Sequence, residues 1–167
     1  MKKISVLLIV VITIISILNI PVEAYVASTD PIVLSDGSKV FYFDDGSSLT
    51  ITQPIIISLE YDQTRSLQTK TTQTSAVHAS SSGETEWIYT LTCTFSYEYG
   101  VSSVCTNASY TQTIYKGNWM FSNGATSISG NRGNGTGLFE RKFLFITVQS
   151  INVQLTMACD IYGNVTA

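Results

Sequence analysis

The sequence is poor in charged residues and contains one histidine, three cysteines and three prolines. Only 13% of its 167 residues are charged, with 9 basic residues against 12 acidic ones. A nucleic-acid-binding protein needs a basic face, so this balance argues against that class. One histidine and three cysteines make a multi-ligand zinc site hard to assemble. We therefore expect no nucleic acid, no metal and no cofactor, in a chain long enough for one modest domain with accessory segments.

The sequence also lacks a second long apolar run after the one at its N-terminus. Met1-Lys2-Lys3 precedes the apolar residues 4–20, and Pro21-Val22-Glu23-Ala24 follows, with small residues where a signal peptidase reads. This layout predicts a secretory signal peptide over residues 1–24, cleaved after Ala24. An uncleaved anchor is the alternative, but a bilayer-spanning helix needs about 20 apolar residues. We expect a secreted, extracellular protein with no membrane span after cleavage.

The remaining chain falls into three segments by pattern. Residues 25–63 predict short N-terminal strands and hairpins, with turns at Asp36-Gly37 and Asp45-Gly46. Residues 64–83 are half Ser and Thr, which predicts an extended linker, and His78 is expected to be incidental there. Residues 84–167 predict a separate β-domain.

Alternation of apolar and polar residues is the main signal within residues 84–167, and no helical stripe of useful length occurs after the leader. The four glycines of residues 130–137 predict a loop, and Asn123-Gly124 predicts a turn. Strands are predicted over residues 87–97, 103–115, 118–121, 139–151 and 153–161. Short, evenly spaced strands predict an all-β fold, a small β-sandwich or barrel-like C-terminal domain after the N-terminal strands and the linker.

Export permits one disulfide among Cys93, Cys105 and Cys159 and leaves one thiol. Side chains alternate along a strand, so Cys93 and Cys159 each lie on an apolar face. Cys105 instead shares its face with the polar Asn107 and Ser109. Parity therefore favours a Cys93–Cys159 pair, unless a β-bulge shifts Cys105 by one position.

Several features occur together along the chain. They are the leader, the segment 41–47, the Ser/Thr/Lys-rich connector around residues 65–74, Trp87, the hairpin containing residues 94–97 and Cys105, Trp119 with residues 129–131, and the terminal segment 155–160. In these the chain resembles a group of small secreted β-proteins from Gram-positive, Clostridia-like bacteria, to which no activity is assigned. The resemblance covers most of the mature chain and implies a Cys105–Cys159 disulfide with a local bulge, where parity favours Cys93–Cys159.

Candidate catalytic groups are few. His78 has no cysteine or acidic residue near it in the sequence, and Thr92 and Thr94 offer no cation that would activate Cys93 as a nucleophile. The carboxylate pairs face no predicted groove, as glycoside hydrolysis would require; they are Asp44 with Asp45, Glu60 with Asp62, and Glu84 with Glu86. We expect no catalytic residues.

Aromatic side chains are the remaining candidates for binding, because aromatic platforms contact sugars and protein partners. The candidates are Trp87, Tyr97, Tyr99, Tyr110, Tyr115 and Trp119. The predicted function is a secreted, non-catalytic binding module for an extracellular protein or a glycan. The alternative is a structural subunit of an extracellular filament or surface layer, in which the apolar residues 51–59 join a neighbour's sheet by strand addition. The sequence leaves the oligomeric state open.

Overall fold

The computed structural model describes residues 30–61 and 67–167, so the predicted leader and its cleavage site lie outside the described residues. The described residues form eleven strands. These are β1 (Ile32–Val33), β2 (Lys39–Tyr42), β3 (Ser48–Ile51), β4 (Ile55–Tyr61), β5 (Leu67–Ala79), β6 (Thr85–Glu98), β7 (Ser102–Ile114), β8 (Trp119–Ser129), β9 (Arg132–Phe143), β10 (Ile146–Cys159) and β11 (Val165–Thr166). No helix in the described ranges has the length and apolar character needed to cross a bilayer.

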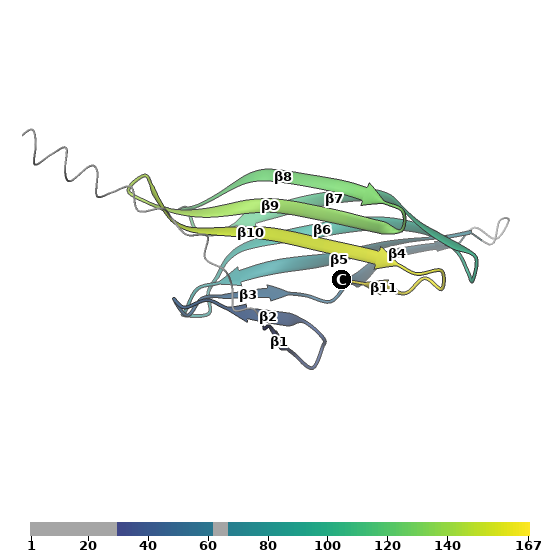
Figure 1. The fold of residues 1–167 in the computed structure, drawn as a ribbon, viewed down its shortest axis with the longest axis horizontal. Coiled ribbons are helices and arrows are strands. Elements are labelled where there is room, and N and C mark those ends of the chain that lie inside the picture. Colours follow the sequence, from purple (N-terminus) through teal and green to yellow (C-terminus); the bar gives the residue numbers. More distant parts are fainter. Residues whose placement is uncertain (1–29, 62–66) are drawn as a thin grey trace, which may run out of the picture.

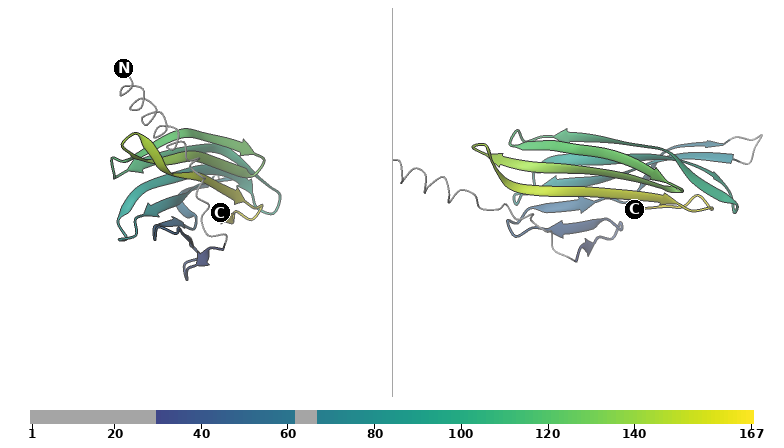
Figure 2. Two further views of the ribbon diagram at one scale, coloured as in Figure 1. Left: turned by 60° about the vertical axis from the view of Figure 1, so that its left-hand side comes forward. Right: turned by 45° about the horizontal axis from the view of Figure 1, so that its top comes forward.

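The strands form two antiparallel sheets that pack face to face (Figure 1 and Figure 2). Sheet A has the order β1-β2-β3-β5-β6-β7, with β4 also paired to β5. Sheet B has the order β11-β10-β9-β8. The predicted all-β sandwich is confirmed.

The core lies between the sheets and follows the predicted alternation. Inward-facing residues of β6 and β10 are buried while their neighbours are partly or fully exposed. From β6 these are Trp87, Tyr89, Leu91, Cys93, Phe95 and Tyr97, and from β10 Ile151, Val153, Leu155, Met157 and Cys159. The alternation works because one face of each strand meets the other sheet and the other face meets solvent.

The predicted linker is wrong for residues 67–79, which form β5 in the interior of sheet A. β5 pairs with β6 along its length and with β3 and β4 on its other side. Its polar side chains bond across the sheet, as in Ser75 Oγ with Thr90 Oγ1 at 2.8 Å. Thr suits a strand by its β-branching, so a Ser/Thr-rich stretch can be a central strand. Because β5 joins β3 to β6, the described residues form one sandwich rather than an N-terminal unit and a separate domain.

The predicted glycine-rich loop is also wrong, because Gly133, Gly135 and Gly137 lie within β9 and face the core. A Cβ at Gly135 would lie 2.8 Å from the Tyr89 hydroxyl oxygen, and one at Gly137 would collide with the Phe121 ring. The glycines therefore make room for large side chains from sheet A and β8. Alternate glycines keep the strand period of two, which the loop interpretation overlooked.

The strand predicted over residues 139–151 is interrupted by a turn. Phe143 pairs with Ile146, and Leu144 and Phe145 form a two-residue turn with φ of 46° and 71°. Such turns usually carry Asn-Gly, because a left-handed conformation costs other residues about 1–2 kcal/mol. The sequence gives no turn signal here. The predicted turn at Asn123-Gly124 is instead an irregularity within β8.

The two turns predicted near the N-terminus are confirmed. Gly37 and Gly46 have φ of 82° and 79°, which a residue with a side chain rarely adopts. The carboxylates of Asp36 and Asp45 accept hydrogen bonds from the backbone N–H of Ser38 and Ser47, each at 2.9 Å. These local bonds fix the turns that connect β1, β2 and β3.

Candidate functional site

The three cysteines lie together in the core. Cys93 and Cys105 both approach Gly133 of β9, where a Cβ would collide with the Cys93 Sγ and lie 3.1 Å from that of Cys105. The predicted bulge is confirmed: Thr94 pairs with Asn107 and Phe95 with Cys105, so the extra residue Thr106 turns Cys105 inward. None of the three is disulfide-bonded in the structure.

Backbone contacts bring Cys105 and Cys159 to the same turn from different sheets. The N–H of Cys105 donates to the Gly130 carbonyl at 2.9 Å, and that of Cys159 donates to the Asn131 carbonyl at 3.1 Å. Burial raises the pKa of all three thiols, to about 12 for Cys93. The thiols are therefore protonated at neutral pH and poor nucleophiles. The Cys105–Cys159 disulfide, with Cys93–Cys159 as the alternative, stays a prediction.

The candidate binding aromatics do not form one surface. Trp87, Tyr97 and Trp119 are buried in the core, so they are not available to a ligand. Tyr110 is partly buried against Tyr89 and Phe121. Tyr99 and Tyr115 are exposed but lie near opposite ends of β6. The six rings therefore do not form one platform, because strand alternation and burial place them on different faces.

His78 is a buried residue of β5 rather than an incidental linker residue. Its Nδ1 lies 3.1 Å from Glu86 Oε2, and Trp119 Nε1 donates to the same oxygen at 3.0 Å. The imidazole stacks on Trp87 with ring centres 5.1 Å apart and meets the Trp119 ring edge-on at 5.0 Å. We call the end of the sandwich that holds His78, Trp87 and Trp119 the histidine end. With no exposed surface, the imidazole cannot contact a substrate from solvent.

Three charged groups, each from a different neighbouring segment, act on the pKa of His78. Burial lowers the pKa of His78; the carboxylates of Glu86 on β6 and Asp45 in the β2–β3 turn oppose this, and Arg141 on β9 adds to it. The imidazole is consequently neutral in the folded protein at neutral pH. In the sequence, His78 and Glu86 are merely eight residues apart, which does not indicate a contact. The contact becomes apparent only because β5 and β6 pair.

The depressed pKa of His78 predicts that stability falls as the solution is acidified. The unfolded chain takes up the His78 proton near the ordinary value of about 6.5, before the folded chain does. The free energy of unfolding should therefore decrease as pH drops from 7 through 6.5 towards 5. Asp45, Glu84 and Asp160 have lowered pKa values in the folded state, so their contribution to stability is lost from about pH 5 downwards, as the unfolded chain takes up their protons.

Urea unfolding at a series of pH values measures this slope, and His78→Gln supplies the comparison. The variant should lose most of the slope between pH 7 and 5, whatever its stability at pH 7. A slope that is absent in the natural protein, or unchanged in the variant, would contradict a neutral buried imidazole.

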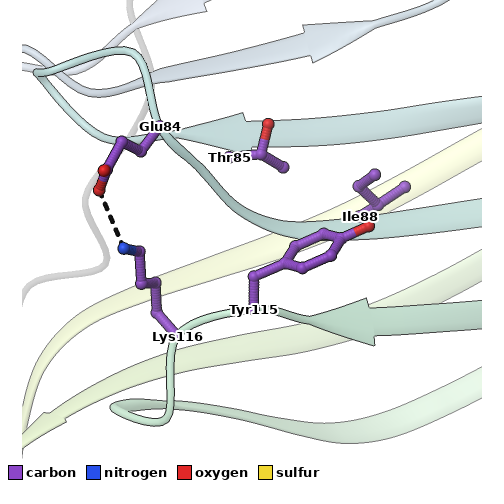
Figure 3. Close-up of a pocket in the computed structure, with 5 residues that line it drawn as sticks. All are labelled: Glu84, Thr85, Ile88, Tyr115 and Lys116. Carbon is purple, nitrogen blue, oxygen red and sulfur yellow. Dashed lines mark hydrogen bonds and ion pairs between the residues drawn. The ribbon is translucent and has the colours of Figure 1, made fainter.

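An open hollow of about 380 Å³ lies beside the histidine end (Figure 3). It is lined by Glu84, Thr85, Ile88, Tyr115 and Lys116. The Lys116 ammonium and the Glu84 carboxylate pair with each other at 2.9 Å, both largely in solvent. Because its charges neutralise one another, this hollow has little to offer a charged ligand.

A second hollow, of about 240 Å³, lies between the two sheets. Its walls are mostly apolar and come from β2, β3 and β5 on one side and β10 on the other. Its lining includes no residue of β4.

Strand β4 forms a separate edge of sheet A. It pairs on one side with residues 68–73 of β5, and no strand among residues 30–61 and 67–167 pairs with its other side. Strand β2 pairs with β1 and β3 and not with β4, so no described strand lies beside the outer edge of β4. The apolar side chains of β4 are Ile55, Ile56, Ile57 and Leu59, which are 62%, 61%, 51% and 57% exposed.

Apolar residues occur on both faces of β4 because residues 55–57 are three consecutive isoleucines and side chains alternate along a strand. Ile56 lies opposite the buried Thr72 and so points towards the core side, while Ile55 points to the other face.

Comparison with protein-family models, curated proteins and solved structures finds no match to this chain. The geometry of the exposed surfaces therefore carries the functional argument.

Proposed function

We propose that the protein is a secreted interaction module that acts by binding rather than catalysis, and that it binds a second copy of itself by strand addition at β4. The observation that carries the proposal is the bare, apolar outer edge of β4. An exposed apolar edge presents unpaired N–H and C=O groups and is a template for another strand. The leader-like N-terminus supports export, and the lack of exposed surface on His78 supports binding over catalysis.

A second copy suits this edge because β4 is compatible with itself. Glu60 is its one charged residue, and residues 55–61 contain no lysine or proline of the kind that protects natural edges. Antiparallel pairing of two β4 strands about a two-fold axis puts the two Glu60 carboxylates at opposite ends of the shared ladder. The paired strands would also cover the isoleucines of both copies. β4 stays bonded to its own β5, so assembly needs no exchange of strands.

Two lysines at the edge should abolish self-association. In the Ile55→Lys/Ile57→Lys variant, the new ammonium groups would lie within the shared ladder, where they lose hydration and repel one another. Both positions are exposed, so the fold should be retained. We expect the natural protein to be a dimer by sedimentation velocity and the variant to be a monomer at the same concentration.

Ile128→Lys is the matched control, because Ile128 is an exposed isoleucine on β8, an edge strand of sheet B. This control should dimerise like the natural protein. A natural protein that stays monomeric up to its solubility limit would overturn the proposal. Equal dimerisation of the β4 variant would do so too.

A further inference from the structure

The turn between β9 and β10 is the most exposed apolar feature of the histidine end. Phe143, Leu144 and Phe145 are 66%, 74% and 100% exposed, and Ile146 follows them. We call residues 143–146 the apolar tip. The β9–β10 hairpin extends beyond the other labelled strands at this end in two views (Figure 1 and Figure 2).

Folding does not explain the residues of the apolar tip. Leu144 and Phe145 both have left-handed backbones, where Asn and Gly are favoured, and neither side chain is buried in return. The sequence at the turn is thus unfavourable both for backbone conformation and for hydration. Such a combination points to a contact outside the described residues.

We infer that the apolar tip inserts into the interfacial layer of a lipid bilayer, so that the histidine end faces a membrane surface. The tip is convex and narrow, which suits a deformable apolar medium. Its strands continue their hydrogen-bonded ladder up to Phe143 and Ile146, so few backbone groups lose partners on leaving water. This contact is independent of β4, which belongs to a different sheet.

Residues surrounding the tip resemble the polar belt of a membrane-facing surface. Tyr42 and Tyr115 are exposed at the histidine end, and Tyr rings favour the headgroup layer because they are apolar with a polar rim. Met120 is exposed on β8, which runs beside the base of the hairpin. Lys142 directly precedes the tip and is bonded to Glu140 and Thr147.

Charge at this end is mixed, which indicates apolar rather than electrostatic attachment. Lys116 pairs with Glu84 and Lys142 with Glu140, so these cations are already balanced by carboxylates. Binding should therefore occur on phosphatidylcholine vesicles, with little dependence on salt or on anionic lipid.

The test is flotation of the exported protein, produced with its natural leader, with phosphatidylcholine vesicles. The decisive variant is Leu144→Asn/Phe145→Gly, which installs a favoured turn and removes the apolar side chains together. Its partition coefficient should fall at least about tenfold, because transfer of a Leu and a Phe side chain out of water is lost. Its thermal unfolding temperature should rise, which separates lost insertion from lost folding.

Val101→Thr is the control, because Val101 is an exposed apolar residue at the opposite end, next to the Tyr99-Gly100 turn. It should bind vesicles like the natural protein. A second measurement uses Phe145→Trp, whose additional emission should shift to the blue when vesicles are added.

Three results would overturn the inference. They are no vesicle binding by the natural protein, equal binding by the tip variant, and a tip variant that changes oligomeric state without changing vesicle binding. The last would assign the tip to a protein contact. Dimerisation through β4 is measured without lipid, so either proposal can fail while the other stands.

Discussion

Gly135→Val is expected to destabilise the protein by about 3 kcal/mol, a large part of the stability of a small domain. The strand conformation tolerates valine, but the core does not. A Cβ at Gly135 would lie 2.8 Å from the Tyr89 hydroxyl oxygen and 2.9 Å from Leu91 Cδ1, both on the opposite sheet. The Tyr89 hydroxyl also donates to the Thr136 carbonyl at 3.0 Å, so it cannot move away without losing that bond.

Urea unfolding measures the effect, with Gly117→Ala as control. Gly117 has no atom within 4 Å of the position its Cβ would take, so that substitution should change stability little. If Gly135→Val unfolds at the same urea concentration as the natural protein, the close approach of β9 to sheet A is incorrect.

Glu86→Leu is the second change with a large expected effect, a loss of about 3 kcal/mol at neutral pH. The carboxylate accepts from Trp119 Nε1 and lies 3.1 Å from His78 Nδ1. Leucine fills similar space but removes the acceptor of the buried Trp119 Nε1 and the carboxylate beside His78. Glu86→Gln should lose less stability, because its amide oxygen can still accept from Trp119.

Glu84→Leu is the matched control two residues earlier in the sequence. Glu84 is exposed and pairs only at the surface with Lys116, so its replacement should leave the unfolding curve nearly unchanged. Equal effects of the two leucine substitutions would show that the contacts of Glu86 with Trp119 and His78 do not stabilise the histidine end.

The sequence was most informative where side chains alternate strictly. The inward faces of β6 and β10 and the Asp-Gly turns follow from local patterns. Each depends on a period of two or on one well-defined turn chemistry. Such signals need no knowledge of the other sheet.

Prediction failed where the environment determines the structure. Thr and Ser of β5 have no apolar period, yet neighbours on both sides make them a central strand. The glycines of β9 look like a loop until Tyr89 and Phe121 occupy the space above them. The turn at Leu144-Phe145 has no turn residues, and its apolar side chains look like the middle of a strand.

Candidate sites were affected in the same way. Trp87, Tyr97 and Trp119 are buried because their strand faces pack against the other sheet. The sequence alone does not show which face of each strand does so. His78 acquires its partner only because β5 and β6 pair. The sequence singled out the apolar segment that includes β4, but only the sheet order reveals that one edge of this strand is bare.

Residue-resolved hydrogen exchange of β4 at low and high protein concentration tests the central claim most directly. Strand addition between two copies predicts that the β4 amides not bonded to β5 become protected as concentration rises. Ser102–Ile114, on the opposite edge of sheet A, should exchange at the same rate throughout. Unchanged exchange in β4 at concentrations that populate a dimer would contradict the account, as would new protection confined to β7.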